Sequence, residues 1–273
     1  MVWLSLALYA FCMSPAAAKE REPALTLGIL PVSSPLALFE RFAPLRDFLG
    51  ETLGLEVRLA SARDFPSFIR NTAAGEYDIV LTAPHLVPGA VDSGHYTVRA
   101  TFREEIRAAV LVRSEGPVNH LEELAGRPVA APPQAAIVSM VGADMMLQSL
   151  SPGAVAPEFV HYPNHNAAVQ AVALGFTDAA IVSLIIAQQA IDDGLPLERL
   201  ATSRPIPGLG VLVSRRLPES VQAGVGETLI GMEASDQGRQ VLKQILLQGF
   251  VAADPEVFEF LRPFAPQPVG GDG

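Results

Sequence analysis

Hydroxyl and imidazole side chains follow two apolar runs that lie one hundred residues apart. Thr82 and His85 come directly after the apolar residues 79–81, and Ser183 ends a second run over residues 179–183. Hydroxyl and imidazole groups both donate and accept hydrogen bonds, so they suit noncovalent recognition of a small polar or anionic molecule. A metal site would need three or four converging ligands, and the other histidines are isolated in the sequence, so we predict no metal.

Each apolar run belongs to a repeated unit in which an apolar-periodic stretch, a Gly-x-x-Asp turn and a short apolar run follow one another. The two units cover residues 65–82 and 167–183, with Gly75 and Gly175 placed where a glycine ends a helix. Short apolar runs after such helices are typical of parallel strands that are buried on both faces. Because ligands of open α/β sheets bind beyond the carboxyl ends of the strands, the repeat predicts two lobes facing one ligand.

The rest of the chain alternates strand and helix patterns, restarts after Ser114 and returns to its first pattern near Gly208. Alternation of this kind predicts an α/β fold with parallel-rich sheets. We expect one lobe from residues 25–107 and 208–264, a second from residues 108–207, and a flexible tail over residues 265–273. Within the first lobe, the helix that begins at Pro35 is expected to restart at Pro44, since proline interrupts the backbone hydrogen bonds of a helix.

Four helix starts are expected at the ends of strands, where unpaired N–H groups and the positive end of the helix dipole favour anions. They follow Ser33 and Ser34, residues 82–84, residues 133–134 and residues 164–166. His85 and His165 are interpreted as matching histidines in the first turns of two such helices. For every hydroxyl and amide here the alternative is plain helix capping, for which serine, threonine and asparagine are equally suited.

The composition excludes several classes of partner. A formal net charge of −10, with Lys19 and Lys243 as the only lysines, disfavours nucleic acid and anionic membrane surfaces, which require clustered basic residues. The sequence lacks a Gly-x-Ser-x-Gly elbow, a glycine-rich phosphate loop and a His-Glu-x-x-His motif. We therefore predict a binding protein without a cofactor, and an enzyme that uses the same cleft is the less favoured alternative.

Residues 1–18 have the character of a secretory signal. They contain no charged side chain, have an apolar centre and end in three alanines before Lys19. The basic start that is typical of such signals is missing, and a retained membrane anchor is the alternative, although the apolar centre is shorter than the roughly 20 residues that span a bilayer. Cleavage after Ala18 would remove Cys12, the only cysteine, and leave a periplasmic protein without disulfides.

Several motifs, taken in order, resemble the phosphonate/phosphite-type solute-binding proteins of ABC transporters. The motifs occupy residues 28–31, 41–54, 75–84, 121–130 and 165–180. The resemblance implies a type II periplasmic binding fold, with two lobes joined by two crossing strands near residues 106–112 and 210–214. It also implies a monomer that closes on its ligand and delivers it to an ABC transporter permease. A sensory role, in which a membrane kinase reads the same closure, is the alternative.

One loop departs from the family pattern. Where phosphonate binders have a loop rich in serine and threonine after a strand of the second lobe, residues 131–139 offer two prolines and only Ser139 as a hydroxyl. We therefore expect phosphonates to bind weakly compared with another small anion or zwitterion. The ligand-binding residues that the sequence predicts are Ser33, Ser34, Thr82 and His85 on one lobe and Gln134, His165 and Ser183 on the other.

The signal sequence predicts the mass of the exported protein. Protein recovered from the periplasmic fraction should begin at Lys19, because small residues precede the cleavage site of such signals. Intact-mass spectrometry measures this directly. A chain that begins at Met1 and is recovered in the membrane fraction would contradict the prediction.

Overall fold

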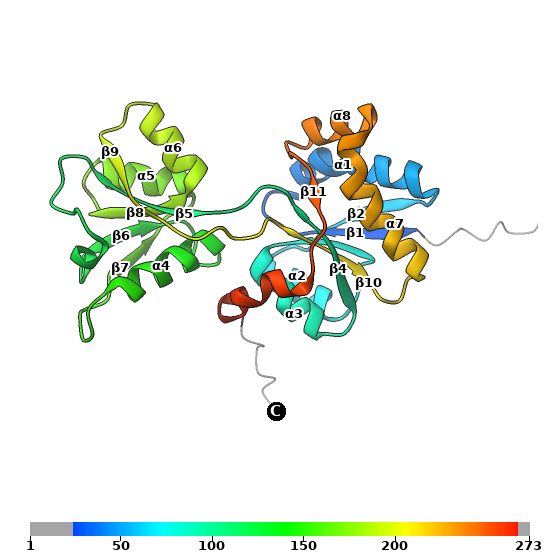
Figure 1. Cartoon of the computed structure of the whole chain (residues 1–273), viewed down its shortest axis with the longest axis horizontal. Helices are drawn as coiled ribbons and strands as arrows, with labels where there is room; N and C mark the ends of the chain where they lie inside the picture. Colours follow the sequence, from blue (N-terminus) through cyan, green and yellow to red (C-terminus); the bar gives the residue numbers. More distant parts are fainter. Residues whose placement is uncertain (1–23, 267–273) are drawn as a thin grey trace, which may run out of the picture.

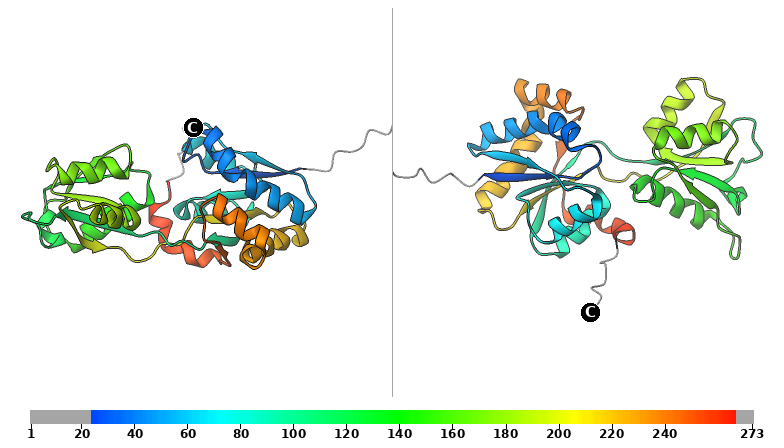
Figure 2. Two further views of the ribbon diagram at one scale, coloured as in Figure 1. Left: turned by 90° about the horizontal axis from the view of Figure 1, so that it is seen from above. Right: turned by 180° about the vertical axis from the view of Figure 1, so that it is seen from behind.

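The computed structural model describes residues 24–266, which form two α/β lobes joined by two extended segments (Figure 1). The predicted signal, its predicted cleavage site and residues 267–273 lie outside the described part. Within residues 24–266, no helix combines the length and the apolar character needed to cross a membrane. The two lobes lie side by side along the longest axis of the molecule in all views (Figure 2).

The first lobe is built on a sheet with strand order β11-β4-β10-β3-β1-β2. The pairs β1–β2 and β1–β3 are parallel, whereas β10 runs antiparallel to both β3 and β4. The strands are β1 (Leu25–Ile29), β2 (Val57–Ala60), β3 (Ile79–Thr82), β4 (Tyr96–Phe102), β10 (Gly210–Ser214) and β11 (Phe250–Val251).

Helices cover both faces of this sheet and close two apolar cores. Side chains of α1, α7 and α8 pack on one face, and those of α2, α3 and the 3₁₀ segment η4 pack on the other. The bounds are α1 (Pro35–Leu53), α2 (Phe65–Ala73), η1 (Pro84–Leu86), α3 (Val87–Asp92), α7 (Glu219–Ile230), η3 (Gly231–Ala234), α8 (Asp236–Gln244) and η4 (Pro255–Phe264).

The second lobe repeats the plan with strand order β7-β6-β8-β5-β9. Its helices α5 and α6 pack on one face of the sheet, while α4 and η2 pack on the other. The elements are β5 (Ala108–Arg113), η2 (Leu121–Leu124), β6 (Pro128–Ala131), α4 (Ile137–Ser149), β7 (Glu158–His161), α5 (His165–Ala173), β8 (Ala179–Ser183), α6 (Leu184–Asp192) and β9 (Leu197–Thr202).

Five strands of the first sheet correspond in order and direction to the five strands of the second, and β11 has no counterpart. The parallel strands β2, β1 and β3 correspond to β7, β6 and β8, and the antiparallel β10 and β4 correspond to β5 and β9. In each sheet the antiparallel strand next to the parallel set is the one that arrives from the other lobe. The repeat that the sequence shows at residues 65–82 and 167–183 is therefore part of a repeat of whole lobes.

The segments that cross between the lobes are shorter than the sequence suggests. Ile106 and Ile206 form an antiparallel bridge, in which each N–H donates to the other carbonyl at 2.8 Å. The strands β5 and β10, expected to cross, each lie within a single sheet. The sequence predicts crossing strands near residues 106–112 and 210–214; Ile106 of the bridge lies within the first range, and Ile206 lies just before the second.

Three local expectations also differ from the structure. The helix α1 runs through Pro44 without a break, since the apolar side chains on both sides of the proline are buried in one core. The helix α4 starts at Ile137, later than residues 133–134 indicated. The strand β9 went unpredicted because its residues Glu198 and Arg199 are exposed, as expected for an edge strand with one solvated face.

The aspartates of the repeated Gly-x-x-Asp turns bind arginines at the edge of each sheet where the parallel strands begin. Asp78 accepts hydrogen bonds from the Thr26 amide at 2.8 Å and from two nitrogens of Arg216 at 2.9 and 3.1 Å. Asp178 occupies the same place in the second lobe, yet its arginine partners Arg113 and Arg127 lie farther away, at 3.5 and 3.4 Å. The repeated turn therefore stabilises each lobe at the end remote from the hinge.

The two aspartates offer a matched pair for a stability measurement. Asp78→Asn should lower the free energy of unfolding by about 2 kcal/mol, since it removes hydrogen bonds to a charged, nearly buried group. Asp178→Asn should cost less than about 1 kcal/mol, because longer ion pairs near the surface contribute little. Urea denaturation of both variants measures the difference, and equal costs would contradict this account of the repeat.

Candidate functional site

The strand directions bring the carboxyl ends of β3 and β8 to the hinge. Thr82 at the end of β3 pairs with Gly210, and Ser183 at the end of β8 pairs with Ala108. Gly210 and Ala108 are the first residues of β10 and β5, and each follows shortly after the Ile106–Ile206 bridge. The ends of the parallel strands of the two lobes therefore face each other on either side of the hinge (Figures 1 and 2).

Each lobe has a topological switch point at this place. The connection after β1 leads to α1 on one face of the first sheet, while the connection after β3 leads to η1 and α3 on the other face. In the second lobe, β6 leads to α4 on one face and β8 leads to α6 on the opposite face. A crevice opens between neighbouring strands where their connections diverge in this way, and ligands of α/β sheets bind there.

The predicted residues of the first lobe divide into exposed and buried groups. Ser33 and Ser34 are exposed after β1, and the Ser34 hydroxyl caps α1 by accepting from the Ala37 amide at 3.3 Å. Thr82 and His85 are buried, with only 1% and 4% of their surface exposed. In the conformation described here, therefore, the serines lie on the open face of the loop, and the other two residues lie inside the lobe.

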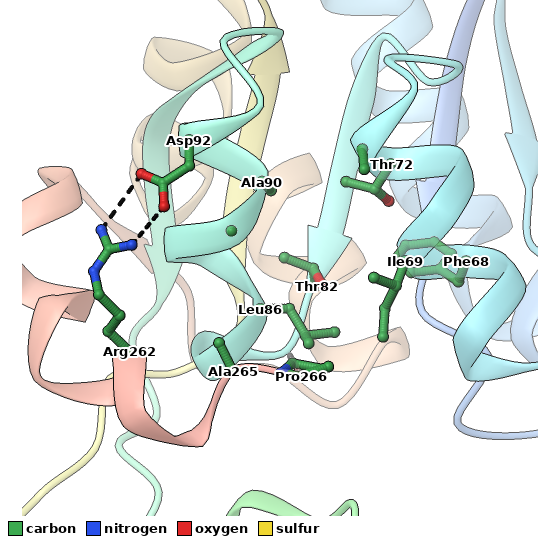
Figure 3. A pocket seen from close by; sticks show the side chains of 12 residues that line it. Phe68, Ile69, Thr72, Thr82, Leu86, Ala90, Asp92, Arg262, Ala265 and Pro266 are labelled. Carbon is green, nitrogen blue, oxygen red and sulfur yellow. Dashed lines mark hydrogen bonds and ion pairs between the residues drawn. The ribbon is translucent and has the colours of Figure 1, made fainter. Parts of the chain in front are cut away.

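Thr82 lines a separate cavity of about 430 Å³ that lies within the first lobe (Figure 3). The cavity lies between α2, α3 and the end of η4, with apolar walls that include Phe68, Ile69 and Leu86, and the ion pair Asp92–Arg262 lies at one side. Ala265 and Pro266 also contact it, so the first two residues of the expected flexible tail pack against the lobe. This cavity is distinct from the space between the lobes.

His85 is held as a neutral imidazole by its surroundings. Burial lowers the pKa of His85 to about 4, and its Nδ1 atom has no hydrogen-bond partner among the described residues. His85 lies in the segment that follows β3, whereas His165 begins the helix that precedes β8. Both histidines thus lie in the first turn of a helical segment, one in each lobe, as predicted, but they occupy different positions in the repeated plan.

His165 and Ser183 contact each other in the second lobe. The Ser183 amide donates to Nδ1 of His165 at 3.1 Å, which places the proton of the neutral ring on Nε2. Burial lowers the pKa of His165, so the ring is neutral at pH 7 and its Nε2–H is a hydrogen-bond donor. The helix α5 is capped by Asn164, which accepts from the Ala167 amide at 2.9 Å.

Gln134 is exposed in the loop between β6 and α4. The loop is anchored by the carbonyl of Pro132, which accepts from Nδ1 of His161 at 2.7 Å and from the Ser139 hydroxyl at 3.1 Å. His161 is isolated in the sequence, and its role in positioning this loop was therefore not predicted. A histidine that ends a strand of the parallel set was the available signal.

The helix starts at the hinge differ in whether a side chain already caps them. Side chains cap α1, α2 and α5, but α4 and α6 begin without a side-chain cap. The amides of Ala136, Ser183 and Leu184 already donate to Pro133, His165 and Arg107, so the free N–H groups are those of residues 137–138 and 185–186. These residues begin the helices that follow the neighbouring strands β6 and β8 of the second lobe. The start of α6 was not among the four helix starts expected from the sequence, and the helix start after Thr82 leads only into the short η1 and α3.

No group of three or more His, Cys, Asp or Glu within residues 24–266 could hold a metal ion.

The fold and the facing switch points define a two-lobed binding protein of the type II periplasmic class. Residues 27–258 match the periplasmic phosphonate substrate-binding proteins of ABC transporters, and the chain belongs to this family. The phosphonates-binding periplasmic protein of Escherichia coli K12 is 27% identical over 117 residues, which cover 41% of this chain but only 35% of that protein. Less than two thirds of that relative is therefore matched.

Solved structures confirm the fold. The methylphosphonate complex of PhnD1 from Prochlorococcus marinus has a TM-score of 0.69 at 13% identity, over 88% of this chain and 96% of the other. The XAC2383 protein of Xanthomonas citri, bound to chloride, scores 0.73 at 15% identity over 88% and 95%. A phosphonate transporter component from Pseudomonas aeruginosa scores 0.65 at 16% identity over 89% and 85%.

The burial of His85 predicts a loss of stability in acid. A pKa of about 4 in the folded protein and of 6.5 in the unfolded chain means that the unfolded state binds the proton first as the pH falls. Stability contributed by the neutral ring is present above pH 6.5 and is lost between pH 6.5 and 4, with about 2 kcal/mol gone at pH 5.

Urea denaturation at pH 7 and pH 5 tests this, with His85→Gln as the variant that cannot titrate. The loss between the two pH values should be about 2 kcal/mol smaller in the variant. An equal loss in both proteins would show that His85 is not the responsible group.

Proposed function

We propose that this protein is a periplasmic solute-binding protein, which closes on a small anionic or polar ligand and delivers it to an ABC transporter permease. The observation that carries the proposal is the register at the hinge, where Thr82 pairs with Gly210 and Ser183 pairs with Ala108. With this register, the switch points of the two lobes lie on either side of the Ile106–Ile206 crossing. Rotation about the crossing would enclose a ligand between the lobes, which is hinge closure of the type that binding proteins use.

The lobes that would move are residues 25–107 with 208–264 and residues 108–207. Membership of a transporter family favours delivery to a permease over reading by a sensor kinase, and it favours binding over catalysis. The related structures support an anionic ligand, since one contains methylphosphonate and the XAC2383 protein is bound to chloride in one structure and to ATP in another.

The ligand contacts proposed here are those of the sequence analysis, ranked by their surroundings. His165 offers Nε2–H, and Ser183, Gln134, Ser33 and Ser34 lie on loops that face the other lobe. The start of α6 adds free N–H groups beside Ser183. Thr82 and His85 are buried within the first lobe, so we propose that they position the loop after β3.

Two measurements test the proposal, one on the wild-type protein and one on a variant. Small-angle scattering should show compaction of the wild-type protein when methylphosphonate or a short carboxylate is added at saturating concentration. His165→Ala should weaken the affinity measured by calorimetry about tenfold, because it removes one hydrogen bond to a charged ligand, worth roughly 1.5–3 kcal/mol.

Gln170→Ala is the matched control, since Gln170 is exposed on the same helix and lies more than one turn after His165. It should leave both affinity and compaction unchanged. A protein that keeps one shape at saturating ligand, or a His165→Ala variant that binds as tightly as the wild type, would contradict the proposed site.

A further inference from the structure

Large apolar side chains are exposed on the loops where a ligand would have to enter. Val32 and Leu36, before and at the start of α1, are 60% and 70% exposed, and Ile185 at the start of α6 is 74% exposed. Val32 lies in the loop after β1, Leu36 in the first turn of α1, and Ile185 in the first turn of α6. The segments that follow β1 and β8 lie on the facing sides of the two lobes (Figures 1 and 2). Exposed apolar side chains at the entrance to a site can contact the apolar part of a ligand.

Charged side chains are scarce on the same loops. Residues 30–36, 82–86, 131–136, 161–166 and 183–186 contain no Asp, Glu, Lys or Arg. The loop after β2 carries Arg63 and Asp64, which pair at 3.1 Å, and Asp64 also caps α2. Burial of an ionic group is costly unless it is paired, so these loops suit neither a dianion nor the ammonium group of a zwitterion.

The arginines of the hinge are engaged with other groups. Arg103 pairs with Glu233, and Arg107 lies 3.3 Å from Glu105. Arg204 is stacked over the ring of Phe260 at 3.9 Å. The remaining attraction for an anion comes from uncharged donors, namely the N–H groups at the uncapped starts of α4 and α6 and the His165 ring.

We propose that the ligand is an organic monoanion with an apolar substituent, such as a short-chain carboxylate, whose apolar part contacts Val32, Leu36 and Ile185. This inference rests on the proposed function and names the class of ligand for the same site. A single negative charge can be held by neutral donors, and the apolar part removes the exposed side chains from water when the lobes close. It also gives a physical reason for the lack of hydroxyls in residues 131–136.

Calorimetry with acetate, butyrate and hexanoate, and with methylphosphonate, tests the inference. The affinity for carboxylates should rise about fourfold for each added methylene, the gain for burying one such group. Methylphosphonate should bind more weakly than hexanoate. Leu36→Ser and Ile185→Ser should each lower the affinity for hexanoate at least fivefold and leave that for acetate within twofold.

Leu174→Ser and Phe176→Ser are the matched controls. Both side chains are similarly exposed, at 65% and 72%, but they lie in the turn that precedes β8, at the opposite edge of the second lobe. These variants should bind the whole series as the wild type does. If Leu36→Ser also bound every ligand of the series as tightly as the wild type does, the inference would be overturned.

Three other outcomes have distinct meanings. An affinity that does not change with chain length, while methylphosphonate binds and compacts the protein, overturns the inference and leaves the proposed function standing. Equal weakening of every ligand by Leu36→Ser and Ile185→Ser means that these residues contact the opposite lobe on closure, which also overturns it. Failure of every anion to bind or to compact the protein rejects the proposed function, and the inference with it.

Discussion

The exchange of one antiparallel strand between the lobes is the constraint on which the rest of the structure depends. Because β10 and β5 enter their sheets directly from the Ile106–Ile206 bridge and run antiparallel to β3 and β8, both parallel strands must end at the hinge. Loops and helix starts follow from these ends, so the segments that carry the polar groups of both lobes lie on the sides that face the hinge. The Gly-x-x-Asp turns are placed by the same rule at the far ends, where they stabilise each lobe separately.

A second set of contacts joins the lobes beside the hinge. Ile137 and Val141 of α4 belong to the same buried apolar cluster as Phe258 and Leu261 of η4, although α4 lies in the second lobe and η4 in the first. Since α4 also begins at the loop that carries Gln134, the loop and the inter-lobe packing are parts of one rigid element. When the lobes rotate, α4 and η4 must stay in contact or slide along each other. Closure is therefore restricted to directions that do not expose these apolar side chains to water.

Much of the fold follows from the sequence because its determinants are local. The apolar runs, the caps Ser34, Asp64 and Asn164, and the glycines after α2 and α5 all act within a few residues of the elements that they define. The features that the sequence did not predict depend on contacts between residues that are distant in the sequence. The helix through Pro44 persists because one core holds both of its halves, and β9 forms because it pairs with β5 in spite of its charged residues.

The site was predictable as a set of loops but not as a set of side-chain orientations. The end of a strand can be read from an apolar run, whereas the burial of Thr82 and His85 depends on η4, which is contributed from the other end of the chain. The same limit applies to the histidines, since the role of His161 appears only once Pro132 lies beside it. Strand ends define where a ligand can bind, and the packing of remote segments against those ends determines which side chains can reach it.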